Sequence, residues 1–182
     1  MNFKLQLVAC RSEGEESLIE EVFTWSREDL TLPNVGLPLA ESKALLQTIQ
    51  QKMIGQQVAR HLERHQPVDL RKKGRYPLQL KTLFGDVTVD SPRYYLPPTE
   101  TGPKTFSPLQ HLFPQHVTPE RLYLETKWAS LIPYQKTADL LHDVLPLNEK
   151  LTGTTIQQHL HAVVEAQEQQ LSPEVASFQG SC

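Results

Sequence analysis

The chain has very little cysteine, with only Cys10 and Cys182 among its 182 residues, one near each end. This scarcity argues against a disulfide framework and against a cysteine-rich zinc site, and it is typical of a reducing compartment. Long apolar runs are also missing, so no membrane-spanning helix is predicted. The apolar stretch before Cys10 is interrupted by Lys4 and Gln6 and is too short for a signal peptide. We therefore expect a cytoplasmic protein without a membrane partner.

Strong net charge is missing as well. The whole chain carries a formal charge of only -3, so no global basic field attracts nucleic acid indiscriminately. The positive charge is local, because residues 71–104 hold seven basic side chains against three acidic ones, a net charge of +4. The basic residues of this segment are Arg71, Lys72, Lys73, Arg75, Lys81, Arg93 and Lys104.

Catalytic motifs are not found either. The sequence contains no glycine-rich phosphate loop, no GxSxG elbow and no Cys/His arrangement for nucleophilic attack. His61 and His65 lie four residues apart, a spacing that can hold a metal, but no third ligand accompanies them, and a solvated pair is the better interpretation. His159 and His161 are two residues apart and cannot chelate one ion together. We expect no catalytic centre, no metal and no cofactor; an enzyme with an unrecognised site is the last-ranked alternative.

The periodicity of apolar residues predicts an α+β fold. Alternation at 3–7 and again at 20–25 predicts two strands joined by a hairpin loop over 11–17. Next, one long helix is predicted over about 39–65, with an apolar stripe, and then a basic hairpin over about 71–96 that turns at Gly85-Asp86. The stripe consists of Leu45, Ile49, Met53, Val58 and Leu62. Residues 1–96 thus form a small, β-hairpin-rich N-terminal part.

The C-terminal part is predicted to be helical. Residues 97–117 are rich in proline and are interpreted as a linker, whereas 118–171 contain three amphipathic helices, the first starting at Thr118-Pro119. The first helix is expected to bury Leu124, Trp128 and Leu131. The second helix begins after Pro133 and is expected to bury Ala138, Leu141, Val144 and Leu145. The third starts at Thr154 or Thr155, with Thr155 and Gln158 at capping-box spacing, and buries Ile156, Leu160, Val163 or Val164, and Leu171. Residues 172–182 are expected to be a disordered tail.

The last two helices, joined by a turn that contains Gly153, have a helix-turn-helix pattern. In that motif the N-terminal residues of the second helix face base edges in the major groove. The base-contacting candidates are Thr154, Thr155, Gln157, Gln158 and His161. Two observations keep the alternative of an ordinary helical bundle open: any bundle has a polar outer face, and the turn over 147–153 is longer than usual. Phosphate contacts are assigned to Arg71, Lys72, Lys73, Arg75 and Arg93.

Several longer segments carry a resemblance to a known family. They are LPLAESKALLQTIQQ, KTLFGDVTVDSPRYY, KTFSPL, TPERLYLETKWASLIPY and TADLLHDVLPLNEKLTGTTIQQHLHAVVE, and they cover most of residues 37–165. In this order and spacing they resemble the N-terminal region of ISKra-type insertion-sequence transposases. Relatives commonly carry cysteines after the long helix and after the strand matching Arg93-Tyr94-Tyr95, but this chain has none there, so the resemblance implies no zinc site here.

The resemblance implies a function in DNA transposition. In that family a ribonuclease-H-like domain with an acidic metal-binding triad follows the N-terminal region and cuts and joins DNA strands. This chain stops where that domain is expected to begin, so the catalytic residues of the family have no positions here. We therefore expect a truncated transposase that recognises double-stranded transposon ends and has no catalytic activity. Two alternatives remain: an oligomerisation module that acts as a homodimer or in mixed oligomers with a full-length transposase, and a non-functional remnant of a broken gene.

Overall fold

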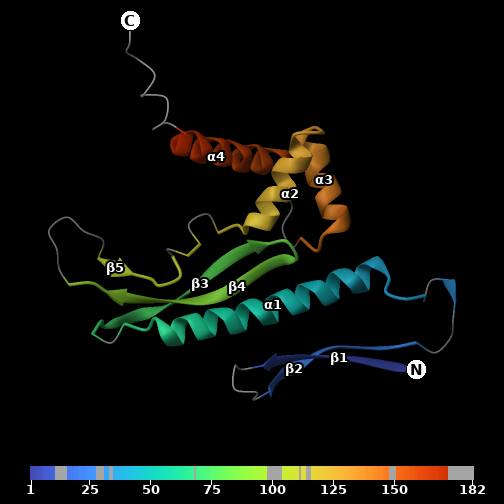
Figure 1. Cartoon of the computed structure of the whole chain (residues 1–182), viewed down its shortest axis with the longest axis horizontal. Coiled ribbons are helices and arrows are strands. Elements are labelled where there is room, and N and C mark those ends of the chain that lie inside the picture. The colour runs from blue at the N-terminus through green and yellow to red at the C-terminus, as the bar shows by residue number, and fades with distance from the viewer. Residues whose placement is uncertain are drawn as a thin grey trace, which may run out of the picture.

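The computed structural model describes residues 1–10, 16–27, 31–32, 35–67, 69–97, 104–110, 112–113, 116–147 and 151–171. Within them the chain forms two small antiparallel sheets and four helices, a mixed α+β architecture (Figure 1). The strands are β1 (Asn2–Cys10), β2 (Glu16–Ser26), β3 (Lys72–Thr82), β4 (Gly85–Tyr95) and β5 (Thr105–Phe106). The helices are α1 (Leu39–Arg64), α2 (Pro119–Ala129), α3 (Tyr134–Val144) and α4 (Gly153–Leu171). No described helix combines the length and the apolar character that crossing a membrane requires.

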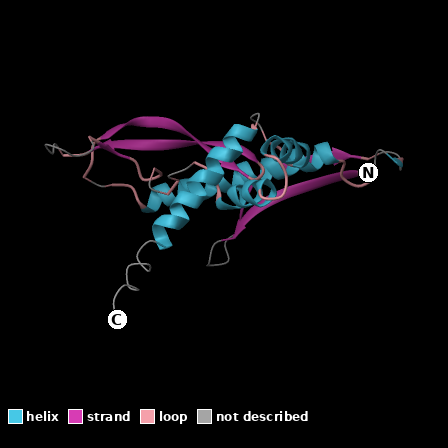
Figure 2. Cartoon of the chain, turned by 90° about the horizontal axis from the view of Figure 1, so that it is seen from above, coloured by secondary structure: helices cyan, strands magenta, loops and turns pink. Residues whose placement is uncertain are grey.

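The elements are stacked in layers. Helix α1 lies between the β1–β2 hairpin on one side and the β3–β4 hairpin on the other, and the three C-terminal helices lie beyond the β3–β4 hairpin (Figure 1). Figure 2 shows the same arrangement from above, with both hairpins extended along the length of the molecule. The β3–β4 hairpin thus packs between the long helix and the C-terminal helices.

The first hairpin confirms the two strands predicted from alternation. Its register pairs Phe3 with Trp25 and Leu5 with Phe23. The rings of Phe3 and Trp25 stack with their centroids 6.0 Å apart, as expected for aromatic residues directly opposite each other on one face. The loop tip, residues 11–15, lies outside the described residues.

The long helix is confirmed over almost the whole predicted range. Its buried stripe, however, runs through Ile54, Val58 and Leu62, which share the core with the β3–β4 hairpin. Met53 was predicted to belong to this stripe and is instead 46% exposed, because the 54, 58, 62 spacing turns position 53 away from the sheet. At the other end of α1, Glu41 forms an ion pair with Arg27, which follows β2.

The second hairpin is present, but its turn differs from the predicted one. Leu78 pairs with Val89 and Leu80 with Val87, and all four join the core. The turn was expected at Gly85-Asp86, which is wrong: Thr82 already pairs with Gly85, so Leu83 and Phe84 form the loop. Gly85 has a φ of +100° and begins β4, which explains why glycine stands just after the loop rather than in it.

Part of the predicted linker over 97–117 is packed into the fold. Strand β5 extends the second sheet by pairing with the end of β4, and Leu109 is fully buried among the core residues of the hairpin. Further along, Lys81 N donates to His116 O at 2.7 Å and Thr118 N donates to Lys81 O at 2.9 Å. The apolar anchors Leu109 and Phe113, which the proline content obscured, fix this segment onto the sheet. The division of the chain into domains stays a prediction.

The three predicted C-terminal helices are present and share a second core, made of Ala138, Leu141, Leu147, Leu151 and Ile156. Several details differ from the prediction. The hydroxyl of Thr118 makes no capping bond to α2, and the Thr155–Gln158 capping box is not formed because Thr152 accepts the hydrogen bond from Thr155 N. The side chains predicted to be buried but found exposed are Trp128, Leu131 and Val144, and of the alternatives Val163 and Val164 the first is half-buried and the second exposed. The predicted tail, residues 172–182, lies outside the described residues.

Candidate nucleic-acid interface

The five predicted phosphate-binding cations gather at one end of the second sheet. Arg71 directly precedes β3, and Lys72, Lys73 and Arg75 lie at its beginning. Arg93 lies near the end of β4, which is the neighbouring position in an antiparallel hairpin. All five are exposed. Among the described residues, Arg75 alone of the five comes within ion-pair distance of a carboxylate, that of Asp90 at 4.0 Å. The cluster therefore keeps most of its positive charge.

Two tyrosine rings lie among these cations. The guanidinium of Arg93 is 4.5 Å from the centroid of the Tyr76 ring. Arg71 and Lys73 lie 6.0 Å and 5.8 Å from the centroid of the Tyr95 ring. These distances fall within the range of cation–π attraction, so the rings help to hold the long basic side chains at this end of the sheet. The cations were predicted from the sequence, whereas the two tyrosines were not, although each tyrosine lies one or two residues from a basic residue.

A β-bulge shapes the cluster. The register of β3 on β4 shifts between Lys72, which pairs with Tyr94, and Gly74, which pairs with Arg93, so Lys73 is the extra residue. Such a bulge breaks the alternation of side chains and re-aims one of them. Here it accompanies the placement of the Lys73 ammonium beside Tyr95. Lys72 and Arg75 also line a cleft of about 670 Å³ between α1 and the hairpin.

The predicted base-contacting residues lie on α4. Thr154, Gln157, Gln158 and His161 are exposed and line a shallow hollow together with Ala162 and Glu165. Thr155 is half-buried, and its hydroxyl lies 3.0 Å from that of Thr152, so it supports the start of the helix. Charge does not favour this surface, because residues 118–171 contain four basic and seven acidic side chains.

The two candidate surfaces are well separated. The basic cluster lies at the open end of the β3–β4 hairpin, whereas α2 and α3 lie over its turn (Figure 1). Lys72 and Thr82 are the two ends of β3, ten residues apart, which corresponds to roughly 33 Å at about 3.3 Å per residue. The structure thus brings the predicted phosphate contacts together and gathers the predicted base contacts on α4, but it does not join the two groups into one patch.

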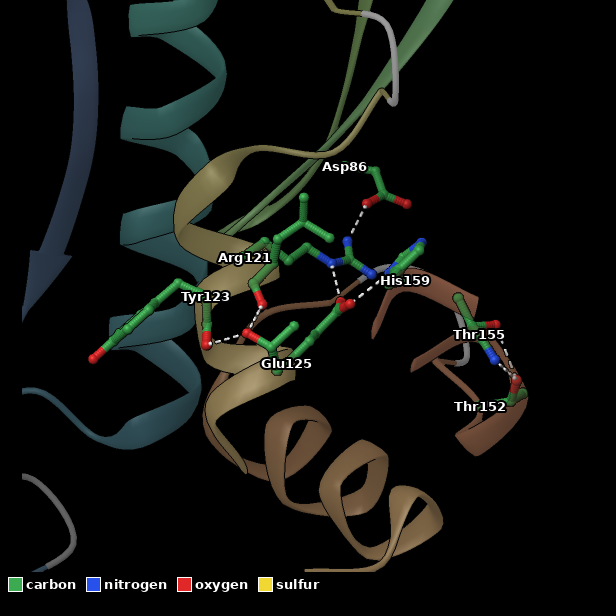
Figure 3. A network of polar contacts seen from close by, with 9 residues as sticks. Asp86, Arg121, Tyr123, Glu125, Thr152, Thr155 and His159 are labelled. Atoms are coloured by element: carbon green, nitrogen blue, oxygen red, sulfur yellow. Dashed lines mark hydrogen bonds and ion pairs between the residues drawn. The ribbon is translucent and has the colours of Figure 1, made fainter. Parts of the chain in front are cut away.

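A buried ionic network connects the helices to the hairpin. Arg121 Nε donates to Glu125 Oε1 at 2.9 Å, and Arg121 Nη1 donates to Asp86 Oδ1, at the start of β4, at 3.1 Å (Figure 3). Glu125 Oε2 lies 2.5 Å from Nδ1 of His159 on α4. Arg121 and Glu125 are 1% and 0% exposed, so water cannot take the place of an ionic partner that either side chain loses.

This network was not predicted from the sequence. The sequence does contain an indication of it, because Arg121 and Glu125 have opposite charges, are four residues apart on α2 and lie on either side of Leu124 in the sequence. Such a pair is more often solvated than buried, so the spacing alone did not single it out.

The rings of His61 and His65 stack on α1 with their centroids 4.1 Å apart. In the described part of the chain no group of three or more His, Cys, Asp or Glu side chains could hold a metal ion.

Comparison with known proteins gave no match to a family model, to a curated protein or to a solved structure.

Proposed function

We propose that this chain binds double-stranded DNA as the end-recognition portion of an insertion-sequence transposase. The observation that carries the proposal is the exposed cluster of Arg71, Lys72, Lys73, Arg75 and Arg93, of which a single member lies within ion-pair distance of a carboxylate in the part of the chain that the structure describes. Cations held close together on a protein surface attract the phosphates of DNA, and each neutralised phosphate releases counterions. The sequence resemblance to transposase N-terminal regions supports the same function. The proposal assigns no strand cleavage to this chain.

Within this proposal the two surfaces have different tasks. The basic cluster holds the DNA backbone, and Gln157, Gln158 and His161 on α4 read base edges, for which glutamine is suited because it pairs with the N6 and N7 positions of adenine. Because the surroundings of α4 are acidic, this helix contributes discrimination between DNA sequences, and the basic cluster contributes most of the affinity. Because the two surfaces lie on different elements, a bound duplex has to extend from the open end of the β3–β4 hairpin to α4 to engage both.

The proposal is tested by fluorescence anisotropy with a labelled duplex that carries the DNA flanking the gene and with a scrambled duplex, at several salt concentrations. Five phosphate contacts predict a slope of log affinity against log salt of about -4 to -5, and Lys72→Ala/Lys73→Ala should reduce its magnitude by roughly 2. Gln157→Ala/Gln158→Ala should leave the slope unchanged and remove the preference for the flanking duplex.

The matched control is Lys127→Ala/Lys136→Ala, which removes the same charge from exposed positions on α2 and α3. It should change the slope far less than the hairpin double variant. If the hairpin variant and the control behave alike, the basic cluster is not the phosphate-binding surface. If the wild-type protein binds neither duplex, the function itself is wrong.

A second candidate function is oligomerisation through α1. Leu39, Leu46 and Met53 are exposed large apolar residues spaced seven apart on this helix. That spacing is the one by which two helices pack along a common line. A homodimer or a mixed oligomer with a full-length transposase would use this line, and a measurement of molecular mass separates it from the DNA-binding proposal.

A further inference from the structure

We infer that Tyr95 and the cations around it form a binding site for unpaired nucleotides. Tyr95 lies on β4, the middle strand of the β3–β4–β5 sheet, and 44% of it is exposed. An exposed aromatic ring on the middle strand of a sheet is a stacking surface for a nucleobase, because every base has a π face. Nearby cations supply the complementary contacts to phosphate.

The backbone holds this ring in place from both sides. Tyr95 N donates to Arg71 O at 2.8 Å, and Tyr95 pairs with Thr105 of β5 on its other side. The next residue continues the same pairing, with Leu96 N donating to Lys104 O at 3.2 Å. The backbone under the ring is therefore ordered before any ligand arrives, which lowers the entropy lost on binding.

The charges around the ring suit a nucleic-acid strand. Arg71 and Lys73 lie about 6 Å from the centroid of the Tyr95 ring, at the outer limit of cation–π contact, so they border the ring and leave part of it exposed. Arg93 stands two residues before Tyr95 on β4, and its guanidinium lies 4.5 Å from the centroid of the Tyr76 ring. A guanidinium supported by a ring in this way offers a second surface on which a base can stack. The site thus combines an exposed ring, a supported guanidinium and two further cations.

This arrangement fits unpaired strands better than duplex. In a duplex each base lies between its neighbours and exposes only its edge, so an exposed tyrosine face has nothing to stack on. A site for duplex phosphates needs cations alone. The inference rests on the proposed function, since both use the same basic cluster, and it adds that bases as well as phosphates are bound at this end of the hairpin.

The test compares a labelled thymidine oligonucleotide of about 10 nucleotides with a duplex, using Tyr95→Leu, Tyr95→Phe and Tyr123→Leu variants. Tyr123 is the matched control, because it is 58% exposed and has Lys127 5.4 Å from its ring centroid but lies on α2, where it points away from the buried network (Figure 3). Circular dichroism of each variant verifies that the fold is retained. A uridine oligonucleotide of the same length shows whether the bound strand is DNA or RNA.

Tyr95→Leu should weaken binding of the oligonucleotide roughly 5- to 100-fold, the range found for loss of one stacked base, and leave duplex affinity nearly unchanged. Tyr95→Phe keeps the ring and should stay within about twofold of wild type, and Tyr123→Leu should have no effect. If Tyr95→Leu behaves like Tyr123→Leu, or weakens oligonucleotide and duplex equally, the inference is overturned while the duplex function stands. Oligonucleotide binding that depends on Tyr95 without any duplex binding would support the inference and overturn the proposed function.

Discussion

Glu125 is fully buried and accepts hydrogen bonds from two elements of the helical part at once. One carboxylate oxygen faces Arg121 on the same helix, and the other faces His159 on α4. Arg121 in turn reaches Asp86 on β4, so a chain of charged contacts runs from the helices into the hairpin. Burying charges is costly unless each one keeps its partner, so every member of this network is sensitive to the loss of a neighbour.

Glu125→Ala should therefore be strongly destabilising. The substitution removes from the buried guanidinium of Arg121 the carboxylate of its own helix, and removal of one member of a buried ion pair typically costs about 3–5 kcal/mol. Urea denaturation measures the free energy of unfolding. Asp139→Ala, which removes an exposed carboxylate that accepts from Gln135 on α3, should cost no more than about 0.5 kcal/mol. Equal losses in the two variants would show that the network contributes no special stability.

At the residue scale, the sequence predicts the charge of a side chain better than its burial and its contacts. The basic residues of 71–93 were identifiable because charge is a property of the residue itself. Whether a charged or aromatic side chain is buried depends on which element covers it, and this is why neither the burial of Glu125 nor the cations around Tyr95 followed from the sequence. Met53 shows the same limit within one helix, since a shift of one residue moved the buried stripe to Ile54.

At the scale of elements, the turn of the β3–β4 hairpin is where the long helix and the C-terminal helices meet. A Cβ atom built on Gly85 would lie 2.9 Å from Pro146 O, in the connection after α3, and 3.1 Å from Nε2 of Gln47 on α1. The positive φ of Gly85 adds a second reason for glycine. One residue thus satisfies the geometry of the turn and the close packing of three segments.

Gly85→Ala should destabilise the protein more than Gly36→Ala. Both positions have positive φ, but a Cβ on Gly36 would meet nothing within 4 Å, so that variant carries only the backbone cost of about 1–2 kcal/mol. Gly55→Ala, in the exposed interior of α1, should instead stabilise by about 0.5–1 kcal/mol because alanine favours helix. Thermal denaturation of the three variants measures the order. If Gly85→Ala and Gly36→Ala are equal, the contact with Pro146 is not restrictive.

All four helices and both hairpins were predicted from the sequence, because these elements depend on local periodicity. The pairing of segments far apart in the sequence was not predicted. Strand β5 has only two residues, Thr105 and Phe106, and becomes a strand through its pairing with Tyr94 and Tyr95. The hairpin turn was misplaced for a related reason, since Gly85-Asp86 is a common turn pair and only the register of Thr82 on Gly85 shows that the loop precedes it.

At the scale of the whole molecule, α1 is covered on two sides by hairpins and keeps an exposed line through Leu39, Leu46 and Met53. These three residues extend over two heptads, fewer than the three to four that mark a stable coiled coil. Any self-association through this line should therefore be weak and dependent on concentration. The line is distinct from the basic cluster, so substitutions can test the proposed association and the proposed DNA binding separately.

If the second candidate function holds, light scattering should give the monomer mass of 20.7 kDa in dilute solution and a mass that rises toward twice this value as concentration increases. Met53→Glu places a charge on the exposed line and should abolish the rise, because desolvating that charge opposes helix pairing. Gln51→Glu, also exposed on α1 but off the line, should leave the rise intact. Both variants should bind duplex as the wild type does. A mass that stays at 20.7 kDa at every concentration would rule out self-association through α1 and leave the basic cluster as the functional surface.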